Sequence, residues 1–255
     1  MAKRNTQWRR RQILDRLDES GEVVVEALAQ EFQTSEVTIR KDLTALESNG
    51  LLLRRHGGAV PLPQDLLRDS AVLSPVKQQI ARLAAQQIRD HHRIIIDSGN
   101  TTAALLPELG SLHGLVVMTN SLGIAQTLLE LENEPTLLMP GGTWDARSEA
   151  FQGQLAEQML RSYDFDQLFI GADGLDVERG TTTFNELYGL SRVMAEVARE
   201  VIVMAESEKL GRKMHNLELP WSTVDRLITD EGISPEQQHR IEQYGVQVLC
   251  APKLI

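Results

Sequence analysis

Short apolar runs alternate with amphipathic stretches along the chain from about residue 76 onward. The apolar runs lie at residues 94–96, 115–118, 136–139, 167–170, 201–204, 226–228 and 246–249. The amphipathic stretches lie at residues 76–89, 102–109, 122–132, 150–161, 186–199 and 235–244. Parallel strands need connections long enough to hold a helix, so this alternation is typical of a mostly parallel sheet covered by helices. We therefore expect an α/β domain over residues 76–255.

Several of these predicted strands end in small or polar residues. The run at 94–96 leads into the hexapeptide DSGNTT, residues 97–102, just before a predicted helix. Ligands of open α/β sheets bind beyond the carboxyl ends of the strands, and the start of a helix favours an anion. We predict a polar pocket there, lined by Asp97, Ser98, Gly99, Asn100, Thr101, Thr102, Thr119, Asn120, Ser121, Gly141, Gly142, Asp173, Glu186 and Lys209. Hydroxyls, carboxylates and one lysine fit a phosphorylated sugar or sugar alcohol better than an apolar ligand or a nucleotide base.

Each of these residues also has a purely structural interpretation. DSGNTT can be a plain strand-to-helix turn, and Gly141 with Gly142 can mark a turn rather than a close approach to a ligand. Glu186 precedes a predicted helix, where a carboxylate also acts as a cap. Asp97, Asp173 and Lys209 can each be ordinary surface groups.

The first 60 residues follow a different pattern. Helices are predicted at about residues 6–18, 26–32 and 36–48, with a short strand at 23–25. Ser35 is a good N-cap for the third helix, which Asn49 and Gly50 end. Residues 51–56 and 59–61, separated by Gly57-Gly58, predict a β-hairpin with a two-glycine turn. A basic hairpin directly after a helix-turn-helix indicates a wing that lies along DNA.

The third predicted helix has an apolar face and a mixed outer face. Ile39, Leu43 and Leu46 form the expected buried stripe. The outer face and its flanks hold Val37, Thr38, Arg40, Lys41 and Thr44, which suit a major groove, although a charged outer face can also be simply solvated. The predicted DNA-binding residues are Arg9, Ser35, Glu36, Val37, Thr38, Arg40, Lys41, Thr44, Arg54, Arg55, His56 and Gly57.

The net charge of -10 hides a division between the two segments. Residues 1–60 hold 10 basic and 9 acidic residues, whereas residues 61–255 hold 16 basic and 27 acidic residues. Affinity for DNA depends largely on neutralising phosphates, so the smaller segment is the expected DNA-binding part. We predict a DNA-binding domain at 1–60, a proline-containing linker at 61–75 and a sensor domain at 76–255.

Several kinds of site and location are not expected. The chain has no Walker loop, no GxGxxG and no His/Cys metal spacing, so neither a cofactor nor a metal is predicted. The one cysteine, Cys250, cannot form an internal disulfide, which fits a reducing compartment. Because no signal peptide and no membrane-spanning run is present, we expect a cytoplasmic protein without a membrane partner.

The stretch VVVEALAQEFQTSEVTIRKDLTALESNGLLLRRHGGAV, residues 23–60, resembles the DNA-binding region of the DeoR family of bacterial sugar-metabolism repressors. IDSGNTT, MTNS, MPGG, FIGADGLD, TTFNE and SEKLG resemble the sensor domain of that family in the same order, and MTNSL, MPGGT, FQGQLAE and TTFNELY look closest to its glucitol operon repressor branch. The resemblance implies a winged helix-turn-helix joined to a domain of the ribose-phosphate isomerase and CoA-transferase type, a sugar-phosphate effector, and an oligomer on operator DNA. Asn100, Glu208 and Leu210 depart from the family pattern, which bears on the choice of phosphosugar.

These observations lead to one principal functional hypothesis and two alternatives. The principal hypothesis is a homodimeric or homotetrameric repressor of a sugar or sugar-alcohol operon that a phosphorylated effector releases from double-stranded operator DNA. One alternative is a sugar-phosphate isomerase or CoA-transferase-like enzyme, with Glu186 as base and Lys209 as its electrostatic partner. The chain lacks a visible nucleophile arrangement, and a winged helix is superfluous for turnover, so we do not expect an enzyme. The other alternative, a purely architectural DNA binder, leaves the larger segment unexplained.

Overall fold

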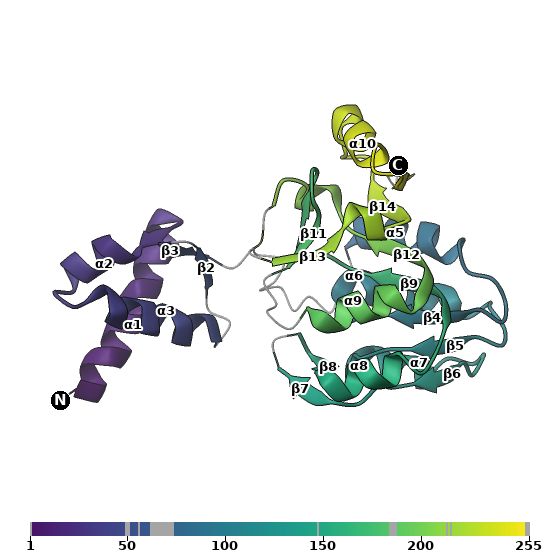
Figure 1. The fold of residues 1–255 in the computed structure, drawn as a ribbon, viewed down its shortest axis with the longest axis horizontal. Coiled ribbons are helices and arrows are strands. Elements are labelled where there is room, and N and C mark those ends of the chain that lie inside the picture. The colour runs from purple at the N-terminus through teal and green to yellow at the C-terminus, as the bar shows by residue number, and fades with distance from the viewer. Residues whose placement is uncertain are drawn as a thin grey trace. The chain divides into compact units, whose positions relative to one another are not determined.

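The computed structural model describes residues 2–48, 52–55, 57–61, 74–146, 148–183, 188–212, 214 and 216–252. The predicted residues His56 and Glu186 lie outside these ranges, as do Asn49 and Gly50. The chain divides into two compact units, Met1–Ala71 and Val72–Ile255 (Figure 1). Within the described ranges, no helix has both the length and the hydropathy to cross a membrane.

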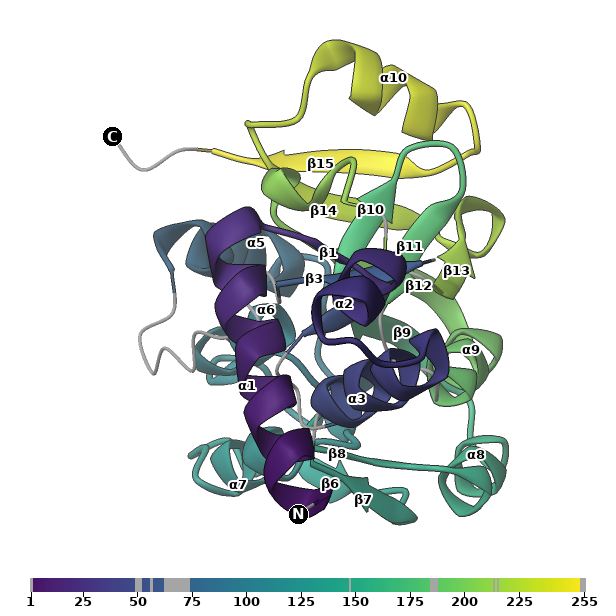
Figure 2. The ribbon, with the colours of Figure 1, turned by 90° about the vertical axis from the view of Figure 1, so that its left-hand side faces the viewer.

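The first unit is a winged helix-turn-helix (Figure 2). Its elements are α1 (Ala2–Ser20), β1 (Val23–Val24), α2 (Val25–Glu31), α3 (Glu36–Ser48), β2 (Leu53–Arg55) and β3 (Gly58–Val60). The three strands form an antiparallel sheet in the order β1-β3-β2. Ile39, Leu43 and Leu46 pack into the core of this unit, so the predicted stripe of α3 is buried. The predicted cap is also present, because Ser35 Oγ accepts a hydrogen bond from the Thr38 amide at 3.2 Å.

The two glycines of the predicted hairpin turn have different roles. Gly57 has a φ of +82° and supplies the left-handed conformation of the turn. Gly58 instead belongs to β3, where it pairs with Val24, so the prediction of a two-glycine turn was wrong for it. A Cβ atom at Gly58 would lie 2.0 Å from the carbonyl oxygen of Val23. Gly58 therefore lets β1 approach β3, a contact that the local sequence does not reveal.

The second unit contains a seven-stranded parallel sheet in the order β15-β14-β12-β9-β4-β5-β6. Its strands are β4 (Arg93–Ile96), β5 (Val116–Met118), β6 (Thr136–Leu138), β9 (Phe165–Ile170), β12 (Ala198–Met204), β14 (Arg226–Asp230) and β15 (Gln247–Ala251). Each strand overlaps one of the seven predicted apolar runs. The expected architecture, a winged helix-turn-helix followed by a mostly parallel α/β domain, is therefore confirmed.

Helices cover both faces of this sheet, which explains the apolar runs within its strands (Figure 1). Ile94 and Ile96 point to one face, which is covered by α5 (Pro75–Ala85), α6 (Asn100–Ala103), the 3-10 helix η1 (Leu106–Leu109) and α7 (Leu122–Leu129). Ile95 points to the other, which is covered by α8 (Gln154–Leu160), α9 (Gly189–Glu196) and α10 (Pro235–Glu242). Burying each isoleucine contributes about 1.5–3 kcal/mol, so this alternation fixes the orientation of β4.

Two smaller sheets were not predicted. One is a hairpin of β7 (Thr143–Asp145) and β8 (Ala150–Gln152), and the other is an antiparallel sheet of β10 (Gly174–Asp176), β11 (Gly180–Thr183) and β13 (Asn216–Pro220). The helix expected from residue 150 is therefore wrong for 150–152, which form β8, and α8 begins only at Gln154. The 3-10 helices η2 (Ser207–Lys209) and η3 (Trp221–Thr223) complete the unit. The segment GTTT of β11 carries no apolar run, so hydropathy alone gives no strand signal there.

Candidate nucleic-acid interface and ligand site

The outer face of α3 is exposed in the pattern that the sequence predicts. Val37 is 58% exposed, and Lys41 and Thr44 are exposed on the same helix. Arg40 pairs with Glu36 one helical turn earlier, at 2.6 Å between Nη2 and Oε2. An apolar side chain this exposed, one turn before Arg40 and Lys41, suits contact with thymine methyl groups in a major groove.

The wing is fixed to α3 through Arg54. Its Nη1 donates to Thr44 Oγ1 at 2.9 Å, and its amide donates to Glu47 Oε1 at 3.0 Å. The Arg55 side chain is exposed and makes no hydrogen bond or ion pair with the described residues. Arg55 is thus available to a phosphate in a way that Arg54, partly occupied by α3, is not.

Arg9 occupies a different place from the other predicted DNA contacts. Its side chain is buried, and its Nε donates to Oδ2 of Asp42 on α3, while Arg10 Nε donates to Oδ1 at 2.8 Å. Asp42 is itself buried, so two charge-assisted hydrogen bonds compensate its charge and tie α1 to α3. This geometry gives Arg9 a structural task, and its contact with DNA stays a prediction.

The strand order of the parallel sheet indicates where a ligand binds in the second unit. From β4 the chain adds β5 and β6 on one side, and it then returns to β9 on the other side of β4 before adding β12, β14 and β15. The direction of strand addition therefore reverses between β4 and β9, and ligands of open α/β sheets bind at this reversal, beyond the carboxyl ends. Asp97 follows β4 and Asp173 lies beyond β9, so both stand at the reversal.

DSGNTT forms the turn between β4 and α6. Thr102 is fully buried, and its Oγ1 lies 2.7 Å from the carbonyl oxygen of Asp97 and 2.9 Å from that of Gly99. Thr101 is also buried, whereas Ser98 is partly exposed and Gly99 and Asn100 are exposed. The hydroxyl of Thr102 therefore closes the turn. Asp97, Ser98, Gly99 and Asn100 are the members of the hexapeptide that solvent, and hence a ligand, can reach.

The residues after β5 are buried and largely occupied by the protein itself. Asn120 Oδ1 accepts from the Ser98 amide at 3.1 Å, which joins the ends of β4 and β5. Thr119 Oγ1 accepts from the Ser121 amide at 3.1 Å, and Ser121 Oγ caps α7 by accepting from the Ile124 amide. This segment shapes the turn that carries DSGNTT, and its predicted ligand contacts remain untested.

Gly142 has a steric reason for being glycine. Its φ is +109°, and a Cβ atom there would lie 2.5 Å from the carbonyl oxygen of Gln152. Gly141, with a φ of +63°, has no atom within 4 Å of the corresponding position. Close approach of the β8 backbone therefore explains Gly142, while Gly141 is explained by its left-handed conformation.

Asp173 and Lys209 lie at the ends of neighbouring strands. Lys209 Nζ donates to the carbonyl oxygen of Ala172 at 2.8 Å, which places its ammonium group beside the residue that precedes Asp173. Asp173 Oδ2 accepts from Thr183 Oγ1 at 2.7 Å, so β11 of the small sheet supports it. The structure therefore brings Asp97, Asp173 and Lys209 to one edge of the sheet, as predicted.

Glu218 on β13 is a buried acid that the sequence does not indicate. Its Oε1 accepts from Ser191 Oγ at 2.8 Å and its Oε2 accepts from Thr181 Oγ1 at 3.3 Å. Burial raises the pKa of Glu218 to about 8, and the negative charges of Asp97 and Asp173 add to this rise. Glu218 is flanked by leucines, and only the pairing of β13 with β11 places it near the other carboxyls. No local sequence signal therefore distinguishes it from a surface residue.

The carboxyl of Asp97 is affected by the same surroundings. Burial raises the pKa of Asp97 to about 6, the negative charge of Asp173 raises it further, and hydrogen bonds from Ser98 and Asn120 oppose the shift. Neutral and ionised carboxyls side by side can both donate hydrogen bonds to hydroxyls and accept them. Among the described residues, no group of three or more His, Cys, Asp or Glu side chains is arranged to hold a metal ion.

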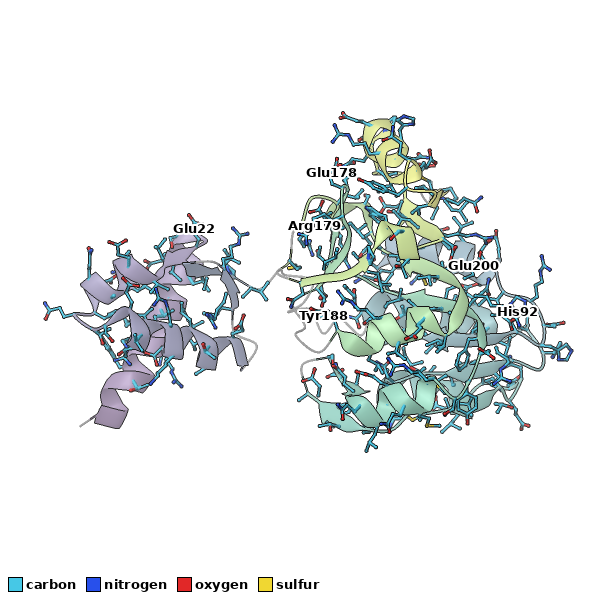
Figure 3. The ribbon with its side chains drawn as sticks, in the orientation of Figure 1. Glu22, His92, Glu178, Arg179, Tyr188 and Glu200 are labelled. Atoms are coloured by element: carbon cyan, nitrogen blue, oxygen red, sulfur yellow. The ribbon has the colours of Figure 1, made fainter. Side chains whose placement is uncertain are left out.

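A separate polar network lies at the amino ends of the strands. Gln167 Nε2 donates to Glu200 Oε2 at 2.8 Å, Glu200 Oε1 lies 2.8 Å from Arg226 Nη2, and His92 Nδ1 lies 3.2 Å from Gln167 Oε1. Figure 3 shows His92 and Glu200 on the far side of this unit from Tyr188. These side chains satisfy one another and join β9, β12 and β14, so they are explained without a ligand.

Comparison with known proteins identifies both units. A model of the DeoR-like helix-turn-helix domain matches residues 9–64, and a model of the DeoR C terminal sensor domain matches residues 74–231. A candidate aga operon transcriptional repressor from Escherichia coli O157:H7 is 38% identical over 252 residues, covering 96% of this chain and 93% of that protein. The lactose phosphotransferase system repressor of Lactococcus lactis subsp. lactis is 31% identical over 249 residues, covering 94% and 97% respectively.

Solved structures give a weaker match. Ribose 5-phosphate isomerase A from Methanocaldococcus jannaschii aligns with 52% of this chain and 53% of its own, with 20% sequence identity and a TM-score of 0.39. This score is too low to bear on the chemistry of the site.

Proposed function

Because this chain belongs to the DeoR family, we propose that it is a DNA-binding repressor of a sugar or sugar-alcohol operon, released from its operator by a phosphorylated sugar bound in the second unit. One observation carries the proposal: a single chain contains both an exposed helix face that carries Arg40 and Lys41 and a polar edge at the strand-order reversal of an α/β sheet. The names of the two relatives, repressors of the aga operon and of a lactose phosphotransferase system, support the sugar operon.

On the DNA side, we assign base contacts to the outer face of α3 and phosphate contacts to the wing. Glu36, Val37 and Arg40 lie at the amino-terminal half of α3, the part of a recognition helix that contacts base edges. Arg55 and His56 are assigned to the phosphate backbone. A homodimer or homotetramer on a two-fold operator would place recognition helices about 34–36 Å apart, in the cytoplasm where the chromosome is accessible.

On the ligand side, we assign the phosphate to the exposed Ser98-Gly99-Asn100 turn and to Lys209. The hydroxyls of the sugar are assigned to the carboxyls of Asp97, Asp173 and Glu186. The domain limits 1–60, 61–75 and 76–255, and the closer placement in the glucitol branch, belong to the same proposal. The relatives are named as regulators, and we assign no catalytic role to this chain.

Fluorescence anisotropy with DNA from upstream of the protein's own gene tests both the proposed DNA binding and the proposed response to phosphosugars. At low salt the protein is expected to bind this DNA, and one or more of a panel of phosphosugars is expected to release it. Lys41→Gln should weaken binding, whereas Arg89→Gln, an equal change of charge at an exposed site of the second unit, should not. Absence of binding at low salt would overturn the proposal, and binding that none of the phosphosugars changes would overturn its sensor half.

A further inference from the structure

We propose that Glu206 is a positioning residue that transmits ligand occupancy from the Lys209 turn to the start of α5, which lies at the end of the predicted linker. This inference rests on the proposed function and names the route of its regulation. Glu206 lies directly before η2 and is only 8% exposed. Within the described part of the chain, its carboxylate makes no hydrogen bond or ion pair with a predicted ligand-binding side chain. A buried carboxylate at such a place requires partners, and its partners come from the segment next to the linker.

The carboxylate of Glu206 holds the start of α5 at two points. Its Oε1 accepts from Ser74 Oγ at 3.1 Å, and its Oε2 lies 3.7 Å from Lys77 Nζ. Ser74 is also the N-cap of α5, because its Oγ accepts from the Lys77 amide at 3.2 Å. One carboxylate therefore fixes the cap and the first turn of the helix that follows the linker.

The backbone of Glu206 is equally bound to the ligand side. Its carbonyl oxygen accepts from the Lys209 amide at 3.0 Å, within the turn whose lysine side chain reaches Ala172. Ser207, between them, is held by Asp230, whose carboxylate accepts from the Ser207 amide and hydroxyl at 2.7 Å each. The direct hydrogen bond between the Lys209 amide and the Glu206 carbonyl oxygen couples a shift of Lys209 toward a bound anion to the position of Glu206.

A second contact joins α5 to the ligand site. α5 packs against α6, the helix that begins within DSGNTT. The start of α5 thus responds to ligand binding through Glu206. The rest of α5 is held against the turn that is proposed to bind the phosphate. The Lys77 pair is at the outer limit of an ion pair, so a displacement below 1 Å strengthens or breaks it. Breaking it leaves a buried charge with fewer partners, which makes the contact sensitive to such small movements.

The test compares how strongly a phosphosugar weakens DNA binding in two matched variants. Glu206→Gln removes the charge at constant size, and Glu200→Gln makes the same change on β12, at an acid that pairs with Arg226 away from the ligand site. The probe is whichever of glucitol 6-phosphate, glucose 6-phosphate, ribose 5-phosphate and inorganic phosphate gives the largest release with wild-type protein. Wild type and Glu200→Gln should show a release factor of about 5- to 150-fold, and Glu206→Gln a factor below about 2-fold.

Phosphosugar affinity without DNA separates transmission from binding. It should change by less than about 2-fold in Glu206→Gln, because the residue does not touch the ligand. Lys77→Met should reduce the release factor too, and the double variant should equal the stronger single variant, since both act through one contact. If Glu206→Gln does not fold, Ser74→Ala, which keeps the ion pair, must still lower the release factor.

The outcomes also separate this inference from the proposed function. An unchanged release factor in Glu206→Gln, with normal release in wild type, overturns the inference and leaves the proposed function intact. A parallel loss of phosphosugar affinity also overturns it, because Glu206 would then belong to the binding site. DNA binding by wild type that none of the four probes changes overturns the sensor function itself, and this inference falls with it.

Discussion

The Ser191 hydroxyl on α9 donates a hydrogen bond to Oε1 of Glu218 on β13, with 2.8 Å between the two oxygen atoms. Thr181 on β11 donates to the other carboxyl oxygen of Glu218, so three elements of the second unit meet at one buried acid. Asp97 and Asp173 act on Glu218 through their charges. The site at the carboxyl edge of the sheet is thus electrostatically coupled to a residue of the small antiparallel sheet above it.

Glu218→Gln should flatten the pH dependence of stability between pH 6 and pH 8. The pKa of Glu218 is raised from 4.5 to about 8 in the folded protein, so within this range the folded state binds a proton that the unfolded state has lost. Unfolding then releases a proton, and the free energy of unfolding falls as pH rises, by up to about 1.4 kcal/mol per pH unit. Urea titrations of both proteins at pH 6, 7 and 8 measure the difference.

The choice of pH range isolates Glu218 from its neighbour. Asp97 also makes the free energy of unfolding fall as pH rises. Because its raised pKa is about 6, this effect lies mainly below pH 6. If the free energies of unfolding of wild type and Glu218→Gln change in parallel from pH 6 to pH 8, Glu218 is ionised in the folded protein at neutral pH.

Lys209→Met should abolish detectable binding of phosphosugars and leave DNA affinity in their absence near that of wild type. Methionine keeps most of the buried stem of Lys209 but loses the ammonium group that donates to the carbonyl oxygen of Ala172. Isothermal titration calorimetry with the released phosphosugar is the direct measurement. Lys41→Met, on α3, is the control and should bind the phosphosugar normally. Retained affinity in Lys209→Met would assign the lysine to structure alone.

Arg55→Ala should weaken DNA binding and reduce its salt dependence. The Arg55 side chain is exposed and free of protein partners among the described residues, so it is available to one phosphate. Losing one phosphate contact should lower the slope of log affinity against log salt by about 0.9. Anisotropy titrations at several salt concentrations determine this slope.

Arg9→Ala should lower the stability of the protein rather than change the salt dependence of its DNA binding. Removing Arg9 leaves the buried Asp42 with Arg10 alone, which should lower the free energy of unfolding by about 1–3 kcal/mol. The salt slope of DNA binding should match that of wild type. A slope reduced as much as in Arg55→Ala would show that Arg9 contacts a phosphate despite its burial.

The sequence revealed those parts of the fold that depend on neighbouring residues. Ile94 to Ile96 form an unbroken apolar run because both faces of β4 are covered, and the spacing of Ile39, Leu43 and Leu46 follows the helical period. The missed features depend on residues far apart in the chain. Arg9 meets Asp42 across 33 positions, and Gly58 is needed only because β1 passes beside it.

The candidate site was also predictable only in those parts that depend on neighbouring residues of the sequence. Asp97, Asp173 and Lys209 follow buried parallel strands, and such strands bring their carboxyl ends to one edge whatever lies between them. Glu218 comes from an antiparallel strand whose register with β11 shifts between Gly180 and Thr182, and neither the spacing of apolar residues nor hydropathy predicts that pairing. The buried hydroxyls of Thr101 and Thr102 show the converse, because residues of the right chemistry were enclosed by their own turn.

Asn100→Thr should change which phosphosugars bind while leaving the fold intact. Asn100 is exposed at the first position of α6, within the turn proposed to receive the phosphate. Threonine adds a hydroxyl donor and removes an amide, so ligands that bond to the amide should lose affinity by about 1 kcal/mol per hydrogen bond. Ligand binding to the native state raises its melting temperature, so thermal shifts across one phosphosugar panel compare the two proteins directly. Ala103→Ser, which adds a hydroxyl on the same short helix, is the control and should leave the ranking unchanged. An identical ranking in Asn100→Thr and wild type would remove Asn100 from the residues that select the ligand.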